Sequence, residues 1–358
     1  MAFDPAQEDC HRLVLGAMRR GQASLTDAAF VERCMGLFQN DIDKLIACDK
    51  DRSFHLIAKA AELIDYRIPF LADEAKAERE AERAENMVRE SRALDPDNWD
   101  AKRVLTALTA ASNDEYVQYL LDNLDTLKND TAQRMAAAED DYDREEAGDL
   151  MRRPYLRWLA ALSSRLLISG RYRMALDYAK QALAFSPVDQ AGVRFTALLA
   201  MAKLECTQED IARFRSDNAL AFQDPLPARR PLRKTTTAND AWTLIAQMSV
   251  AYRDFDLDGA EKILRTILRS YPRAAECLYC QTEFPDGVYS RVNIAPGSQD
   301  ELILALSEAT PLLQEGLGAP DNAGFATWIA THKLVQAELD ESVTRPTGSH
   351  APRNGGEN

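Results

Sequence analysis

The chain has 358 residues and a formal net charge of −14 at pH 7, from 43 Lys and Arg against 57 Asp and Glu. This charge argues against nonspecific nucleic-acid binding, because a polyanion would be repelled, and it favours partners with basic surfaces. No run of about 18 apolar residues is present, so no membrane-spanning helix is predicted. The acidic, polar N-terminus also lacks the pattern of a signal peptide. We therefore expect a cytoplasmic protein that binds neither membrane nor nucleic acid.

Helices dominate the predicted elements, because Gly and Pro are scarce (15 each) and Ala, Leu, Glu, Arg and Asp are abundant. In the first helix Asp4 predicts the cap, Pro5 occupies the first position, and Gly21 follows the basic last turn. Thr26 or Asp27 predicts the cap of a second helix. Apolar spacing then predicts helices at 42–46, 53–65 and 73–94.

Helix stops and starts divide the next part of the chain. Pro69 predicts a break before the charged segment 73–94, which we interpret as a helix with a solvated face. Residues 95–98 (Asp-Pro-Asp-Asn) predict a helix stop and a new start, and Asn113 predicts the cap of a long helix. The acidic stretch 139–149 is compatible with a helix or a loop, and we favour the helix.

The C-terminal half contains the clearest helix pairs. They are predicted at 154–187, 189–222 and 240–272, and a short helix then carries Cys277 and Cys280. An irregular loop over 284–297 leads to Ser298, which forms a capping-box pattern with Glu301. A last helix is predicted from Phe325 to Leu334.

The domain organisation follows from changes in composition. Residues 224–240 hold three prolines, four basic residues and three threonines, which predicts a linker-like loop. We expect an N-terminal helical region at 1–150, a second helical region at 151–341, and a disordered tail at 342–358.

An alanine is followed, twelve residues later, by a proline at three places: Ala84/Pro96, Ala175/Pro187 and Ala260/Pro272. A small residue allows two helices to touch, and a proline ends the second helix. Because three partial matches share one spacing, the pattern is more specific than a single match would be. The middle unit is the most complete, with Gly170 in its turn and Ala182 seven residues after Ala175.

This pattern resembles the second half of a tetratricopeptide (TPR) repeat. From 154 to 317 the order of elements also resembles TPR proteins of the suppressor-of-tumorigenicity type and their bacterial relatives. The segments that carry this resemblance are 270–279 (SYPRAAECLY) and 295–301 (APGSQDE). The resemblance implies an all-α array of helical hairpins, a right-handed α-solenoid, with irregular helices at both ends. It transfers no catalytic residue.

Such an array has a concave surface lined by the first helix of each pair. In the middle unit the groove-facing residues are expected to be Arg157, Ala160, Ser164, Leu167 and Ile168. In the unit around Ala260 they are expected to be Trp242, Ile245, Ser249, Tyr252 and Arg253. Two aromatic residues beside an arginine are typical of a binding hot spot. The alternative is that Trp242 and Tyr252 fill the core.

We therefore expect a non-catalytic scaffold or adaptor that binds a protein or peptide partner on this surface. One alternative is a regulatory sensor whose groove binds a small peptide and controls an effector. The other is an unrecognised enzyme, because 57 acidic residues leave carboxylate chemistry open. No phosphate-binding Gly loop, HExxH, GxSxG or paired Cys/His site occurs, so no catalytic residue, metal ligand or cofactor is assigned.

Two further clusters have competing interpretations. The single CxxC, Cys277 and Cys280, lacks a second ligand pair; we interpret all six cysteines as mostly buried free thiols, with a metal or redox role for the CxxC as alternatives. A basic cluster is interpreted as solvated linker, the alternative being contact with phosphate or an acidic peptide. It consists of Arg229, Arg230, Arg233 and Lys234.

Overall fold

The computed structural model describes residues 4–223, 240–281, 294–313 and 324–344. These residues form helices and turns, with no strand among them. They fall into two compact units. The first unit holds 4–204 and 212–223, and the second holds 205–211, 240–281, 294–313 and 324–344. That residues 1–150 form a separate domain remains a prediction.

The helices of the first unit follow one another with short connections. They are α1 (Pro5–Arg20), α2 (Ala28–Asn40), α3 (Asp49–Tyr66), α4 (Glu74–Leu94), α5 (Trp99–Thr109), α6 (Asn113–Ala136), α7 (Asp141–Gly148), α8 (Arg153–Ile168), α9 (Tyr172–Phe185) and α10 (Val193–Lys203). Short 3-10 turns accompany them at η1 (Ile42–Lys44), η2 (Ile68–Phe70), η3 (Leu150–Arg152) and η4 (Ala219–Phe222). The helix expected at 42–46 is thus a 3-10 turn, and the acidic stretch does form a helix, α7.

The second unit is built in the same way. Its helices are α12 (Ala241–Arg253), α13 (Leu257–Ser270), α14 (Ala274–Cys280), α15 (Gln299–Glu308), α16 (Thr310–Leu313), α17 (Gly324–Thr331) and α18 (Lys333–Thr344). One more helix, α11 (Gln208–Asp217), has residues in both units. None of the helices in the described part of the chain is long and apolar enough to cross a membrane.

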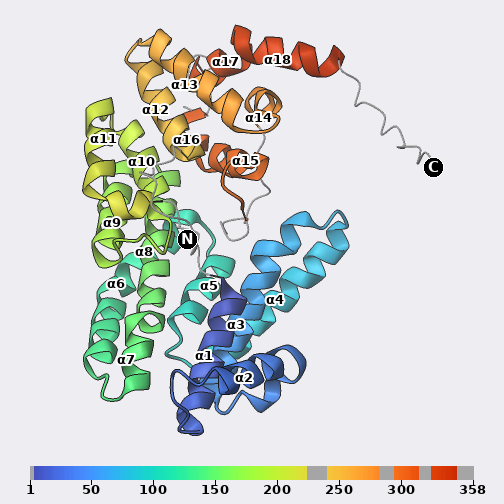
Figure 1. Cartoon of the computed structure of the whole chain (residues 1–358), viewed down its shortest axis with the longest axis vertical. Coiled ribbons are helices and arrows are strands. Elements are labelled where there is room, and N and C mark those ends of the chain that lie inside the picture. Colours follow the sequence, from blue (N-terminus) through green and yellow to red (C-terminus); the bar gives the residue numbers. More distant parts are fainter. Residues whose placement is uncertain (1–3, 224–239, 282–293, 314–323, 345–358) are drawn as a thin grey trace, which may run out of the picture. The chain divides into compact units, whose positions relative to one another are not determined.

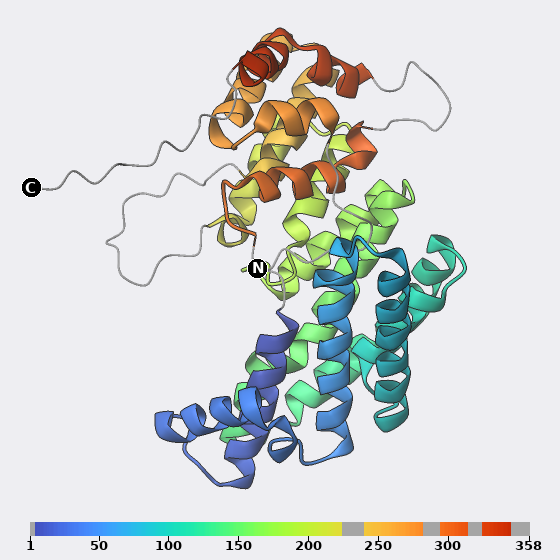
Figure 2. The same ribbon diagram turned by 90° about the vertical axis from the view of Figure 1, so that its right-hand side faces the viewer.

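Most helices that are consecutive in the chain lie side by side within each unit (Figure 1, Figure 2). In the first unit α3 packs against α4, α8 against α9, and α9 against α10; in the second unit α12 packs against α13. The protein is therefore all-α, with helices packed in sequential pairs.

The three alanine–proline pairs mark equivalent helix ends. Ala84, Ala175 and Ala260 are all 0% exposed. Their helices α4, α9 and α13 each end two residues before the proline. The residue between is non-helical in every case, with φ/ψ of −135/94°, −135/87° and −119/133° at Asp95, Ser186 and Tyr271. A proline disfavours helical geometry in the residue before it, which accounts for the common end.

Most predicted caps are confirmed. Asp4 accepts a hydrogen bond from the Gln7 amide (3.0 Å), and Asp27 rather than Thr26 caps α2. The cap of α6 was predicted one residue late, because Ser112 accepts from the Glu115 amide (3.1 Å) and Asn113 is already helical.

The capping box at Ser298 forms in a modified way. Its hydroxyl accepts from the Glu301 amide (3.1 Å), whereas the buried Glu301 carboxylate accepts from Gly297. The same carboxylate accepts from the Ala241 amide and the Tyr271 hydroxyl, both at 3.0 Å. One side chain therefore joins α12, the end of α13 and α15.

The last predicted helix is broken in the structure. Instead of one helix from Phe325 to Leu334, α17 ends at Thr331 and α18 begins at Lys333. Between them the His332 ring accepts from the Leu334 amide (3.3 Å), a capping contact that starts a new helix. Residues 342–344 belong to α18, and the rest of the predicted tail lies outside the described residues, as do 224–239 and 282–293.

Candidate functional site

Arg157, the first predicted groove residue, lies in a buried charge network of the first unit. Its guanidinium donates to Asp100 of α5 (Nε to Oδ1, 2.7 Å) and to Glu8 of α1 (Nη1 to Oε2, 2.7 Å). Glu8, which is 1% exposed, also accepts from Arg12 (2.8 Å) and Arg153 (3.1 Å). The network joins three helices that are far apart in the sequence.

The charges of this network hold one another in the ionised form. Burial opposes ionisation of Glu8, but Arg157 and Arg12 outweigh it and hold the pKa of this carboxyl well below its usual range. Burial likewise opposes the charge of Arg157, and Asp100 and Glu8 together raise its pKa. The arrangement is that of a structural ion cluster, in which neither group is poised to exchange a proton near neutral pH.

The other predicted positions on α8 differ in their accessibility. Leu167 is buried, Ala160 and Ser164 are partly buried, and Ile168 is 56% exposed. Of this set, Ile168 is therefore the side chain that offers apolar surface to a partner.

The predicted groove residues of α12 are covered by other helices of the second unit. Trp242 is buried and its Nε1 donates to Glu308 of α15 (2.7 Å), and Ile245 is completely buried. Tyr252 packs on Phe325 and Trp328 of α17, with ring centroids 5.3 and 5.4 Å apart. This placement is the one expected if the two aromatic side chains fill the core.

The remaining residues of that set lie in the C-terminal half of α12. Ser249 is partly buried, and Arg253 donates to the Cys206 carbonyl (3.1 Å). A role of the α12 set in partner binding remains a prediction.

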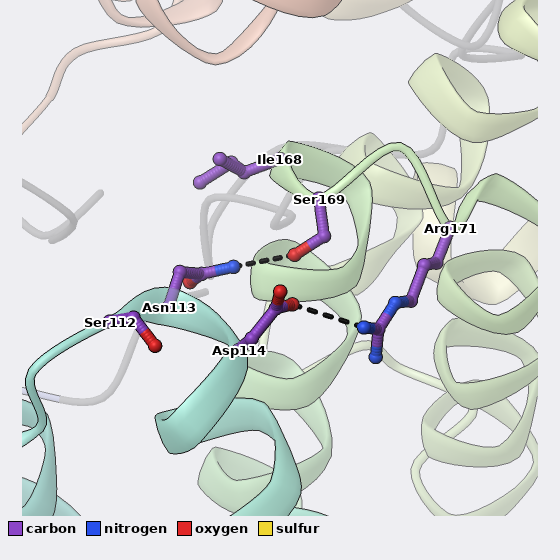
Figure 3. A pocket seen from close by; sticks show the side chains of 6 residues that line it. All are labelled: Ser112, Asn113, Asp114, Ile168, Ser169 and Arg171. Carbon is purple, nitrogen blue, oxygen red and sulfur yellow. Dashed lines mark hydrogen bonds and ion pairs between the residues drawn. The ribbon is translucent and has the colours of Figure 1, made fainter.

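Ile168 borders a hollow of about 330 Å³ in the first unit, where α6 begins and the α8–α9 turn passes (Figure 3). The residues that line it are Ser112, Asn113, Asp114, Ile168, Ser169 and Arg171. We call this hollow the α6–α8 pocket.

The polar side chains of the α6–α8 pocket connect the two walls. Asn113 donates to the Ser169 hydroxyl and to the Arg165 carbonyl (3.2 Å). Arg171 donates to Asp114 (3.0 Å), and both side chains are exposed to solvent (Figure 3). The pocket thus offers an accessible cation, an accessible carboxylate and an apolar wall, and its lining includes no histidine or cysteine.

The spatial neighbours of Ile168 were missed in the sequence. Ser112 begins a Ser-x-x-Glu pattern, which marks a helix start, and Gly170 marks a turn. Each signal indicates where a helix begins or ends along the sequence. Neither signal indicates that α6 begins beside the end of α8 in space.

The cysteines are free thiols, but fewer are buried than expected. Cys34 and Cys277 are buried, whereas Cys48 and Cys280 are exposed. Burial raises the pKa of the Cys277 thiol, and Gln299 approaches its sulfur (3.7 Å). Within the described ranges, no group of three or more His, Cys, Asp or Glu side chains is arranged to hold a metal ion.

Comparison of the chain with family models, with curated proteins and with solved structures gave no match. The fold by itself defines an all-helical protein with helices packed in sequential pairs.

Proposed function

We propose that this protein is a non-catalytic scaffold or adaptor, a TPR-like right-handed α-solenoid that binds a segment of a protein partner. The α6–α8 pocket is the binding site, and the observation that carries the proposal is the exposed Ile168 beside the accessible Arg171.

The helical hairpins support the TPR-like part of the proposal. Three helices carry a fully buried alanine at the same distance from a terminating proline, and in all three the residue before the proline is non-helical. Repeated helix pairs of this kind build extended surfaces that recognise peptides.

The chemistry of the α6–α8 pocket indicates which segment it would take. Ile168 gives an apolar contact, and Arg171 is held by an exposed ion pair of a kind that contributes about 0–1 kcal/mol. A carboxylate from a partner can therefore replace Asp114 at little cost. We infer that the ligand is a short segment in which an apolar side chain adjoins a carboxylate.

Affinity capture from native lysate tests the proposal with Ile168→Asp and Arg171→Glu. Val188→Asp is the matched control, since Val188 is 58% exposed and lies outside the pocket, and Arg173→Glu controls for the charge change. We expect the same proteins to be lost by both pocket variants and kept by both controls. Identical sets of proteins from all four variants would refute the pocket as the binding site.

The regulatory sensor uses the same pocket and differs in its ligand. A synthetic peptide taken from a captured partner should raise the melting temperature of the sensor when added alone. A scaffold that takes the same peptide would also be stabilised, so the sensor is distinguished by a change in its affinity for a second partner when the peptide is added.

A further inference from the structure

Phe255 is the most exposed large apolar side chain in the described part of the chain, at 88%. It lies in the turn between α12 and α13, and its backbone is left-handed, with φ of 60°. A bulky residue in this conformation is an outlier, because its Cβ crowds the neighbouring carbonyl oxygen.

The equivalent turn between α8 and α9 shows what this position ordinarily requires. There Gly170 has φ of 73°, its amide bonds to the Leu167 carbonyl (3.1 Å), and the next amide bonds to Leu166 (2.9 Å). Around Phe255 the same two bonds reach Tyr252 (3.1 Å) and Ala251 (2.9 Å). Both turns are Schellman motifs, and glycine is the residue that this motif favours at the left-handed position.

Packing against the described residues of the second unit does not offset the unfavourable backbone at Phe255. Its ring is almost completely in solvent, so burial of apolar surface does not stabilise the turn. Gln22, which occupies the same place after α1 with φ of 50°, is polar. A solvated phenylalanine in a strained turn points to a contact outside the chain.

The surroundings of Phe255 indicate the charge of that contact. Leu257 is 47% exposed and adds to the apolar surface, while Asp254, Asp256 and Asp258 alternate with these two residues and are all exposed. Asp254 pairs with Arg253, and Asp256 caps α13 through the Gly259 amide (2.9 Å). The turn therefore presents two apolar side chains within a predominantly acidic border.

We propose that this turn, residues 254–258, docks onto a protein partner whose apolar patch is bordered by lysine or arginine. Phe255 and Leu257 enter the patch, and the three aspartates face the basic border. The inference rests on the proposed function and adds a second surface to it, separate in sequence from the α6–α8 pocket.

The test uses the full-length protein and a fluorescein-labelled amphipathic helical peptide built of leucine and lysine, with a leucine–glutamate peptide of the same pattern as its counterpart. Binding is measured by fluorescence anisotropy for the wild type, Phe255→Gly, Asp258→Asn and Phe70→Ala. Phe70 is the matched control, an aromatic side chain that is 60% exposed and lies in η2 of the first unit.

We expect Phe255→Gly to bind the lysine peptide about tenfold more weakly than the wild type, the loss typical of an aromatic hot spot. Asp258→Asn should weaken binding less, Phe70→Ala should match the wild type, and added salt should weaken wild-type binding. The glutamate peptide should not bind. Because glycine suits the turn, Phe255→Gly should melt at the wild-type temperature or above it.

Equal affinity of Phe255→Gly and the wild type for the lysine peptide would overturn the inference. A lower melting temperature of Phe255→Gly would do so as well, since it would give the ring a role in folding. The two proposals fail separately: partners lost by Ile168→Asp but kept by Phe255→Gly in affinity capture would leave the pocket intact and exclude docking through the turn.

Discussion

Glu8 of α1 and Arg157 of α8 are 149 residues apart in the chain and form a buried ion pair with atoms 2.7 Å apart. Two further arginines bond the same carboxylate, so this one acid is shared by three cations. A buried ion cluster of this kind adds little stability compared with well-packed apolar residues in its place. Removing only one of its charges is strongly destabilising, because the other charges are left buried without a partner.

Replacing Glu8 should therefore destabilise the first unit severely. Glu8→Gln removes the shared carboxylate and should lower the free energy of unfolding by about 3–5 kcal/mol. Urea denaturation at neutral pH measures this, with the exposed Glu145→Gln as a control that should change little.

Glu8 should also make stability depend on pH. Because the folded-state pKa of Glu8 is lowered, its contribution to stability is complete above the unfolded pKa of about 4.3 and is lost as the pH falls through the folded value. A Glu8→Gln variant as stable as wild type would show that the cluster does not hold α1 to α8.

Asp65 should show the opposite pH dependence. Burial raises its pKa to about 6, and Arg103 offsets part of the effect. Since the folded state holds the proton more tightly, the wild type should lose up to about 3 kcal/mol of stability as the pH rises from 4 to above 6. Asp65→Asn should remove most of this dependence and stabilise the protein at pH 7. Stability curves at several pH values measure it, with the exposed Asp177→Asn as control. The same slope between pH 4 and 6 in Asp65→Asn and in the wild type would argue against the raised pKa of Asp65.

Replacing Ala175 by leucine tests the contact between the paired helices α8 and α9. Ala175→Leu places a larger side chain where the alanine has no exposed surface, and overpacking should cost about 1–3 kcal/mol. Ala184→Leu is the matched control, because Ala184 lies on the same helix and is exposed. Thermal melting compares the two; equal melting temperatures would mean that α8 and α9 do not meet at Ala175.

Replacing Gly170 by alanine tests the backbone conformation of the α8–α9 turn, not the space around this residue. A Cβ at this residue would have only the Tyr172 hydroxyl nearby, at 3.9 Å, so crowding does not forbid alanine. Gly170→Ala should nevertheless lower stability by about 1 kcal/mol, because φ of 73° is unfavourable for any side chain. Gly36→Ala, in the middle of α2 with nothing within 4 Å, should raise stability by about 0.5–1 kcal/mol. Chemical denaturation of both variants gives the two signs, and a stabilising Gly170→Ala would contradict the left-handed assignment.

Local signals in the sequence predicted much of the secondary structure. The sequence predicts Asp4 and Ser298 as caps and leaves Thr26 or Asp27 for α2, because capping depends on residues within one turn of the helix start. The prolines at 96, 187 and 272 located helix ends for the same reason. The break at His332 was not predicted, since an imidazole seldom caps a helix and its neighbours continue a helical pattern.

The site was harder to predict than the helices, because it depends on contacts between distant segments. The repeat pattern predicts that Arg157 faces a groove, but in the structure Glu8 of α1 binds it. Trp242 was placed on an open face, and α15 covers that face. Ile168, one of the residues expected to face the groove, is exposed, whereas its position beside the start of α6 lies beyond any repeat pattern.

The helices α4, α9 and α13 all end two residues before a proline, and this has a consequence for folding during synthesis. Each proline comes after both helices of a pair have been synthesised, and the partner of each helix is its immediate predecessor. We therefore expect every hairpin to be able to close while the next is still inside the ribosome, because its contacts need only short loops. The order of folding would then follow the order of translation.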